Sequence, residues 1–321
     1  MNTNDRGIKS GFEEVLLSVK DEKPWIDLLV THAGWKIIHA DNLSKEMTSI
    51  LNLAADKNHR ECVISPPDTI RGRLRLLISD PPNKRTMRGN RTSWDTGGIF
   101  DLNVRVKDIN VSHALFKEFG WQEISEPIHW NFGSSEVKEV LMKNDDGIIL
   151  ALIQRIAPEP PSWHLDPVSR VFNSSLIVRN MSENIDFFSK LGFNVLSKHE
   201  GILPDSAGRV LGLTHAEALS TSVDISIMHP SNEMSGSIEL VQVAKAGSHE
   251  VQTSGDQQRG IQALRFQIEN MNHFMQTIEA HALPVTSRSQ SNWQPIGSVD
   301  SVTITSPDAA QMEFFCLRNQ L

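Results

Sequence analysis

The segment 237–243 (SIELVQV) places one carboxylate, Glu239, among apolar strand-forming residues. Burial penalises the charge of such a carboxylate, so this side chain needs a partner. His229 ends the strand-like segment before this one, where its imidazole would lie close to Glu239 as a ligand or a proton-transfer group. A single histidine at a strand end is also commonly a hydrogen-bonded structural residue.

The residues before Glu239 predict the elements that position it. Residues 172–178 form a β-rich, half-alternating run, as in a strand that is covered on one face. Asn180 and Glu183 have the spacing of a capping box, an apolar stripe follows, and Gly192 stands where a helix takes a left-handed residue. The predicted order is strand, helix and three strands, with Glu239 on the last strand.

The same unit recurs four times along the chain. The spacing between the end of its first strand and the turn after its helix is 15 residues in the first copy and 14 in the others: Val19 to Gly34, Val106 to Gly120, Val178 to Gly192, and Ile268 to Ala282. Each copy closes with a comparable strand: GRLRLLIS, GIILALIQR, GSIELVQV and AQMEFFCL. A fixed spacing of this kind indicates a repeat architecture.

The inserts and a proline-rich segment predict how the copies are grouped. Copies one and three carry longer inserts before their last strand, which suggests a duplicated pair, and residues 157–161 (APEPP) resemble a linker. We therefore predict two domains: 1–156 with modules 11–80 and 97–156, a linker at 157–168, and 169–321 with modules 169–245 and 259–317.

These tandem units resemble the vicinal oxygen chelate superfamily, which includes glyoxalase I, bleomycin-resistance proteins, fosfomycin-resistance enzymes and extradiol dioxygenases. The resemblance covers about residues 11–317. It implies an α+β fold in which four βαβββ modules pair into two curled-sheet, cup-like domains. It also implies metal ligands at the start of the first strand and the middle of the last strand of each module.

Eight residues correspond to those ligand positions. They are Glu14, Asp101, Asn173 and Ala263 on the first strands, and Arg75, Ala151, Glu239 and Glu313 on the last strands. The absence of histidine among them disfavours the two-histidine, one-carboxylate iron site of extradiol dioxygenases. Asn173, Glu239 and Glu313 come closest to a metal site. Their oxygens would suit one divalent ion such as Mg²⁺ or Mn²⁺, with Zn²⁺ and iron left open.

Two other interpretations of Glu239 and Glu313 remain open. Two carboxylates that face one cavity push each other's pKa apart, so one could act as an acid and the other as a base without metal. They could instead be structural and pair with Arg265 or Arg179.

The amino-terminal half presents Glu14, Arg75 and Asp101. Arg75 would convert a ligand position into an internal salt bridge or an anion clamp, and Ala151 suggests that this half has become a scaffold. Arg75, Asp101, Asn173 and His129 are nevertheless the candidate substrate-binding residues.

The composition bounds the remaining possibilities. With 22% charged and 39% hydrophobic residues, the chain is typical of a globular protein, and its net charge of -8 disfavours nucleic-acid binding. Two cysteines and the lack of a long apolar run favour a cytoplasmic protein that does not span a membrane. We expect a monomer or a homodimer.

We expect an enzyme of lyase or isomerase type that acts on a small oxygenated organic substrate. In the carboxy-terminal cup, Glu239 or Glu313 would abstract a proton next to a carbonyl or help open a small oxygenated ring. Asn173 would orient the substrate. The alternative is a non-catalytic binding or sequestering protein, as in the drug-resistance members of the superfamily.

Overall fold

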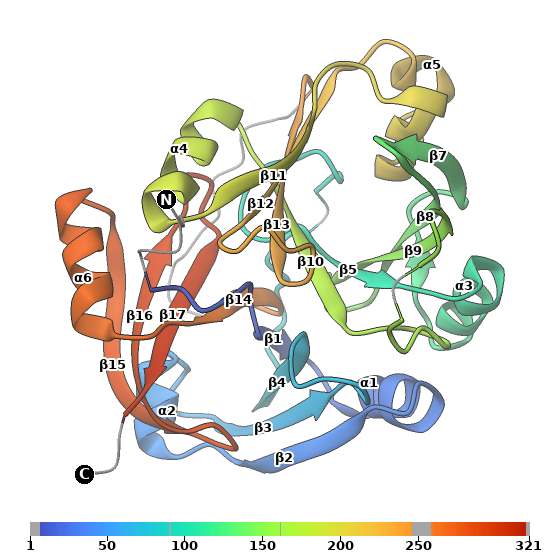
Figure 1. Ribbon diagram of the computed structural model, residues 1–321. Coiled ribbons are helices and arrows are strands. Elements are labelled where there is room, and N and C mark those ends of the chain that lie inside the picture. The colour runs from blue at the N-terminus through green and yellow to red at the C-terminus, as the bar shows by residue number, and fades with distance from the viewer. Residues whose placement is uncertain (1–6, 90, 161, 246–257, 319–321) are drawn as a thin grey trace.

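The computed structural model describes residues 7–89, 91–160, 162–245 and 258–318. Modules one and two come from the amino-terminal half of the sequence, which is coloured blue to green in Figure 1. Module one consists of β1 (Glu14–Val19), α1 (Lys23–Trp25), η1 (Ile26–His32), β2 (Lys36–Asn42), α2 (Lys45–Ile50), β3 (Asn58–Ser65) and β4 (Arg73–Asp80). Module two consists of β5 (Asp101–Arg105), α3 (Ile109–Glu118), β6 (Gln122–Glu123), β7 (Ile128–Phe132), β8 (Ser135–Lys143) and β9 (Ile149–Ala157).

Modules three and four repeat the same order. Module three consists of β10 (Val171–Ile177), α4 (Met181–Leu191), β11 (Asn194–His199), η2 (Pro204–Leu211), α5 (His215–Ala218), β12 (Val223–His229) and β13 (Ser237–Val243). Module four consists of β14 (Gly260–Gln267), α6 (Met271–Ala280), β15 (Val285–Trp293), β16 (Gly297–Thr305) and β17 (Gln311–Leu317). The predicted repeat and the α+β class are confirmed.

Helix α4 forms as its sequence predicts. The Asn180 side chain accepts a hydrogen bond from the Glu183 N–H at 3.2 Å, which satisfies one of the free donors at the helix start. Gly192 ends the helix with φ of 103°, a left-handed conformation that costs glycine little. In module four Ala282 takes the corresponding place with φ of 50°, so an alanine can close this turn as well.

The strands form two curled sheets, each built from two modules (Figure 1). The first sheet has the order β15-β16-β17-β14-β1-β4-β3-β2 and joins modules one and four. The second has the order β11-β12-β13-β10-β5-β9-β8-β6, with β7 paired to β8, and joins modules two and three. The expected pairing of neighbouring modules within 1–156 and within 169–321 is therefore wrong, because each sheet takes one module from each half.

The residues at the centre of each sheet give a physical reason for this pairing. The first strands of paired modules run antiparallel side by side, with Glu14 opposite Arg265 in one sheet and Asn103 opposite Asn173 in the other. All four side chains are buried. Pairing module one with module two would place Glu14 beside Asn103, so Glu14 would lose Arg265 and Arg265 would keep only Glu313 of its own module. Loss of an ion-pair partner is costly for a buried charge.

Modules that are neighbours in sequence meet through their helices instead. The main hydrophobic core contains residues from all four modules and lies on the helix-covered faces of both sheets. Trp25 of α1 packs edge-on against Trp121, with ring centroids 5.5 Å apart, and α4 contacts α6. The opposite, concave face of each sheet points away from this core.

The inserts cover the concave faces. In the second sheet, η2 packs on β7 and β8 over the concave face, and Figure 1 shows α5 and β7 at the same side of the molecule. In the first sheet, Met47 of α2 packs with Trp293, Val299 and Phe315. Within the described residues, no helix has the length and apolar character needed to cross a membrane.

Candidate active site

A cavity of about 120 Å³ lies between the concave face of the second sheet and its cover. A buried apolar cavity of roughly 150 Å³ accommodates benzene in another protein, so this space suits a ligand of about one ring. The walls are mainly aliphatic, with three aromatic side chains: Trp130, Phe132 and Phe172. The polar lining consists of Asn103, Arg105, Ser135, Glu139, Arg155, Asn173 and Glu239. A few polar groups in an apolar cleft are typical of a small-molecule site.

The alternation of side chains along β5, together with a register shift on β10, directs several polar residues into the cavity. Asn103 and Arg105 lie two residues apart on β5, so both side chains point to the concave face, while Leu102 and Val104 point into the main core. On β10, the register with β5 shifts between Val171 and Asn173, and adjacent residues of that strand both line the cavity.

A chain of side-chain hydrogen bonds holds the two asparagines in place. The Asn103 Nδ2 group donates to Asn173 Oδ1 and, at 3.3 Å, to Ser175 Oγ. Asn173 Nδ2 in turn donates to Ser237 Oγ at 2.7 Å. The amide of Asn173 is thus used on both its oxygen and its nitrogen, and it forms a fixed polar floor between β5 and β13.

Glu239 faces the cavity from β13. Among the described residues it makes neither a hydrogen bond nor an ion pair. Burial, with smaller effects from the charges of Glu139 and Asp101, raises the pKa of Glu239 to about 8, and Arg105 opposes this shift. The carboxyl group is therefore mostly protonated at neutral pH.

Glu139 faces the same cavity from β8. Burial, with the Asp101 charge, raises the pKa of Glu139 to about 7, while a hydrogen bond from Trp130 Nε1 at 3.1 Å favours its ionised form. Glu139 consequently loses its proton more readily than Glu239. Two carboxyl groups with different pKa values in one cavity are suited to acid–base work.

Asp101 lies at the edge of this group and is buried. Its carboxylate accepts a hydrogen bond from the Ser175 N–H at 3.1 Å, and burial raises the pKa of Asp101 to about 6. It was expected to bind substrate, but it lies outside the cavity lining and acts on the site through its charge.

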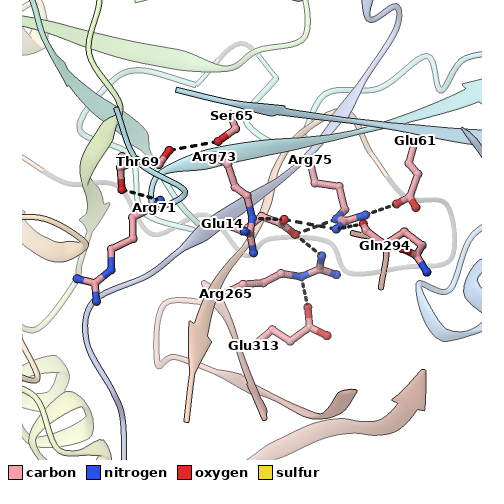
Figure 2. Close-up of polar contacts among 10 residues, drawn as sticks. All are labelled: Glu14, Glu61, Ser65, Thr69, Arg71, Arg73, Arg75, Arg265, Gln294 and Glu313. Carbon is pink, nitrogen blue, oxygen red and sulfur yellow. Dashed lines mark hydrogen bonds and ion pairs between the residues drawn. The ribbon is translucent and has the colours of Figure 1, made fainter. Parts of the chain in front are cut away.

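The concave face of the first sheet is filled by ion pairs (Figure 2). Glu14 is fully buried and pairs with Arg73 at 2.8 Å, Arg75 at 2.8 Å and Arg265 at 2.6 Å. These arginine charges hold the pKa of Glu14 far below its usual range, although burial alone would raise it. Arg265 also pairs with Glu313 at 2.6 Å. Arg75 reaches Glu61 at 2.6 Å and the Gln294 carbonyl at 2.7 Å.

The structure separates the residues expected to form one site. Glu239 and Asn173 lie together in the second sheet, whereas Glu313 lies in the first sheet beside Arg265. The Glu313–Arg265 alternative is the one observed, and Arg75 forms the internal salt bridge. The expected pair of Glu239 with Glu313 is therefore replaced by Glu239 with Glu139, a residue that sequence reasoning did not select.

The two expected histidines have structural surroundings. His229 is buried, and its Nδ1 accepts hydrogen bonds from the N–H groups of Ser231 at 2.9 Å and Glu233 at 3.0 Å. Burial lowers the pKa of His229 to about 4, so the ring is neutral and holds a turn outside the cavity lining. His129 is exposed on β7 and pairs with Glu136 at 2.8 Å, while the next residue, Trp130, faces the cavity.

Register explains why Asn103 was missed and Asp101 was chosen. The residue opposite Asn173 is Asn103, two positions beyond Asp101, and the residue opposite Glu14 is Arg265, two positions beyond Ala263. A two-residue slip keeps the side chain on the same face, so alternation alone does not reveal it. Arg105 could have been found by the same alternation, because it follows Asn103 by two residues.

The donor atoms do not fit the divalent metal that the fold family implies. The four positions around the centre of this cup are Asn103, Ala151, Asn173 and Glu239. Ala151 has no donor, and the Asn173 oxygen accepts from Asn103. Within the described residues, no three His, Cys, Asp or Glu side chains gather as a metal would require. The expected ligand set of Glu239, Glu313 and Asn173 is divided between two sheets.

The two curled sheets of paired modules have the fold of the vicinal oxygen chelate superfamily, as the repeat predicts. Glyoxalase I from Zea mays is similar, with a TM-score of 0.63 and 14% identity over 96% of this chain and 92% of that chain. A point mutant of the same maize enzyme gives a TM-score of 0.64 and 13% identity, with the same coverage. A Bacillus subtilis protein that is provisionally described as a dioxygenase gives 0.59 and 10%, over 95% of this chain and 84% of that chain.

Sequence comparison adds nothing to this structural likeness. No protein-family model matches the chain, and no curated protein matches it. At these identities the similar structures share the fold, and the chemistry of this chain must be argued from its own residues.

Proposed function

We propose that this chain is an enzyme of lyase or isomerase type that moves a proton on a small oxygenated organic molecule bound in the cup of modules two and three. One observation carries the proposal. Two carboxyl groups, Glu139 and Glu239, face a ligand-sized cavity and differ in how readily they ionise. The expected location in a cup of the carboxy-terminal half is revised, because this cup takes Glu139 from the amino-terminal half.

The pair can divide the acid and base roles. Near neutral pH, ionised Glu139 accepts a proton from a carbon next to a carbonyl, so that the C–H electron pair moves toward the carbonyl. Protonated Glu239 donates its proton to the carbonyl oxygen, and the product is an enol. With an α-hydroxy carbonyl substrate this enol is an enediol. Glu139 then gives its proton to the former carbonyl carbon while Glu239 takes the proton of the other hydroxyl group, which completes the isomerisation and restores both carboxyl groups. Positioned acid–base groups of this kind contribute on the order of 10²–10⁴-fold in rate.

The other groups of the cup support these roles. Asn103 and Asn173 form a polar floor whose orientation the hydrogen bond to Ser237 maintains. The apolar walls, with Trp130 and Phe172, keep water away from the reacting atoms and make each electrostatic interaction stronger.

Turnover by matched variants tests this function. A panel of 2-oxo acids, α-hydroxy carbonyl compounds and small epoxides is assayed with wild type, Glu239→Gln, Glu139→Gln and the control Glu136→Gln. Glu136 lies on the same strand as Glu139, but its side chain is 38% exposed and pairs with His129. We expect each cavity variant to lower kcat by about 100-fold or more on any substrate that wild type converts, and the control to retain wild-type activity. Full activity in both cavity variants would rule out the assigned roles.

A binding protein without chemistry is the second candidate. It is favoured by the mainly apolar cavity walls and by the poor fit of the described donor groups to a metal. In that case a ligand of the cup would be recovered chemically unchanged after incubation with wild type. Glu239→Gln would then alter affinity alone.

A further inference from the structure

Arg105 carries a buried charge that forms an ion pair with none of the described residues. The residue is 9% exposed and lines the cavity. Among the described residues its guanidinium makes no hydrogen bond and no ion pair, and its contact is with the Phe172 ring, whose centroid lies 4.4 Å from Cζ. Its backbone N–H donates to Ser169 Oγ at 2.8 Å, which anchors the end of β5.

The stacked position leaves the donors of Arg105 available. A guanidinium has five N–H donors in its own plane, and stacking on an aromatic ring uses its face rather than its edge. Burial lowers the pKa of Arg105 to about 10, so the group remains charged near neutral pH. A charged donor set that is nine-tenths buried is costly unless something binds to it.

The first sheet provides an internal comparison. Its buried arginines Arg73, Arg75 and Arg265 each have a carboxylate oxygen within 2.8 Å. The same chain therefore pairs its buried arginines with carboxylates in one cup, whereas in the other cup none of the described carboxylates forms an ion pair with Arg105.

Neighbouring groups increase the positive character of the cavity. Arg155, on β9, donates to Ser135 Oγ at 3.2 Å, and its buried Nε has no partner among the described residues. The carboxyl groups of Glu139 and Glu239 line the same cavity and act on Arg105 through their charges, but neither forms an ion pair or a hydrogen bond with it. Arg105 and Arg155 are thus placed for an anion that comes from outside the chain.

We propose that Arg105, assisted by Arg155, binds the carboxylate of the ligand, so that the cup selects small organic acids over their uncharged analogues. The planar fork of a guanidinium matches a carboxylate through two parallel hydrogen bonds. The remainder of the acid lies against Trp130, Phe132 and Phe172, which favours an aromatic or branched apolar group. This inference deepens the proposed function and rests on it for the location of the ligand, but it concerns binding and requires no turnover.

Calorimetric titration with benzoate and benzamide tests the inference. The two compounds have the same ring and nearly the same shape, and they differ in charge. We expect wild type to bind benzoate at least about 10-fold more tightly than benzamide, because hydrogen bonds to charged groups are stronger than neutral ones. Equal affinity for the two compounds, or binding of neither, would overturn the assignment without reference to any variant.

Variants locate the preference. Arg105→Gln is expected to weaken benzoate binding by about 10- to 100-fold and to leave benzamide binding nearly unchanged. Arg105→Lys, which keeps the charge and loses the fork, should give an intermediate loss. Arg288→Gln, on exposed β15 of the other sheet, is the matched control. A benzoate preference that survives in folded Arg105→Gln would place the anion elsewhere.

The titrations and the turnover assays together separate this inference from the proposed function. If Glu239→Gln and Glu139→Gln retain full turnover while wild type prefers benzoate, the catalytic roles fail and the carboxylate site stands. If the preference is absent while those variants lose turnover, the catalytic roles stand and the carboxylate site fails.

Discussion

Glu239 and Glu313 occupy equivalent positions on the last strands of modules three and four, yet their surroundings are opposite. Glu313 forms an ion pair with Arg265 at 2.6 Å, in the sheet of modules one and four. Glu239 faces a cavity in the other sheet and pairs with none of the described residues. The cup of modules one and four is therefore filled by ion pairs among its own side chains. The cup of modules two and three contains a carboxyl group that pairs with none of the described residues.

Removing the Glu239 charge should stabilise the protein at alkaline pH. The unfolded chain loses this proton near pH 4.5, but the folded chain holds it to about pH 8. As the pH rises between these values, ionisation therefore favours the unfolded state, and the penalty is complete above pH 8. We expect Glu239→Gln to raise Tm by about 2 °C or more at pH 9 and to change it little at pH 5. Calorimetric melting of this variant and of Glu136→Gln measures the difference, and a lower Tm at pH 9 would contradict the assigned pKa shift.

Carboxylate binding should weaken as the pH rises past 8. Below that pH, Glu239 is mostly neutral, so among the described carboxyl groups that act on Arg105, Glu139 alone opposes its positive charge. Above it, the ionised Glu239 repels the ligand. Benzoate affinity should fall by about 10-fold between pH 7 and pH 9. Glu239→Gln should show a smaller decline, which comes from Glu139. Titrations at both pH values test this, and a steeper decline in the variant would exclude Glu239 as the responsible group.

Breaking the ion-pair cluster should be far more damaging than breaking a surface pair. Glu14→Gln removes the shared partner of Arg73, Arg75 and Arg265. Among the described residues Arg73 is then left without an ion-paired carboxylate, while Arg75 keeps Glu61 and Arg265 keeps Glu313. We expect a loss of about 3–5 kcal/mol in the free energy of unfolding, measured by denaturant titration. Asp27→Asn, which removes an exposed partner of Lys23, should cost less than about 1 kcal/mol. Similar losses in the two variants would show that the cluster adds little.

Cleaving the chain between its sequence halves should not separate them. Each sheet contains one module from each half, and β1 and β5 pair with β14 and β10 across the centres. A protease site inserted after Glu159 should give two fragments that co-elute on size exclusion without denaturant. Each fragment expressed alone should lack a folded sheet centre and melt without a cooperative transition. Two separately folded fragments would restore the domain division that the linker suggested.

Metal removal should leave ligand binding intact. The central positions of the candidate cup hold two mutually bonded asparagines, an alanine and one carboxyl group. We expect benzoate affinity to be the same before and after treatment with EDTA, and elemental analysis of the untreated protein to give far less than one divalent ion per chain. Stoichiometric metal that is lost in Glu239→Gln would instead show that this carboxyl group coordinates an ion.

The sequence by itself determined the local structure and the repeat. The Asn180 cap and the left-handed Gly192 act within a few residues of one another, so their effect can be read from the chain. Four copies of nearly the same spacing, 15 residues in the first and 14 in the others, were enough to predict the repeated modules, and the resemblance that they carry implied the curled sheets. The likeness of Glu239 and Glu313 as last-strand carboxylates was likewise visible.

Only the tertiary structure decided which modules share a sheet and which carboxyl groups share a cavity. All four first strands offer a similar edge, so the choice depends on side chains far apart in sequence, such as Glu14 opposite Arg265. That choice gives Arg265 a second carboxylate, Glu14, beside Glu313 of its own module, and it brings Glu139 and Arg105 to Glu239. Charge pairing between distant segments leaves no recognisable pattern in the sequence, because it depends on which buried charges come together when the sheets form.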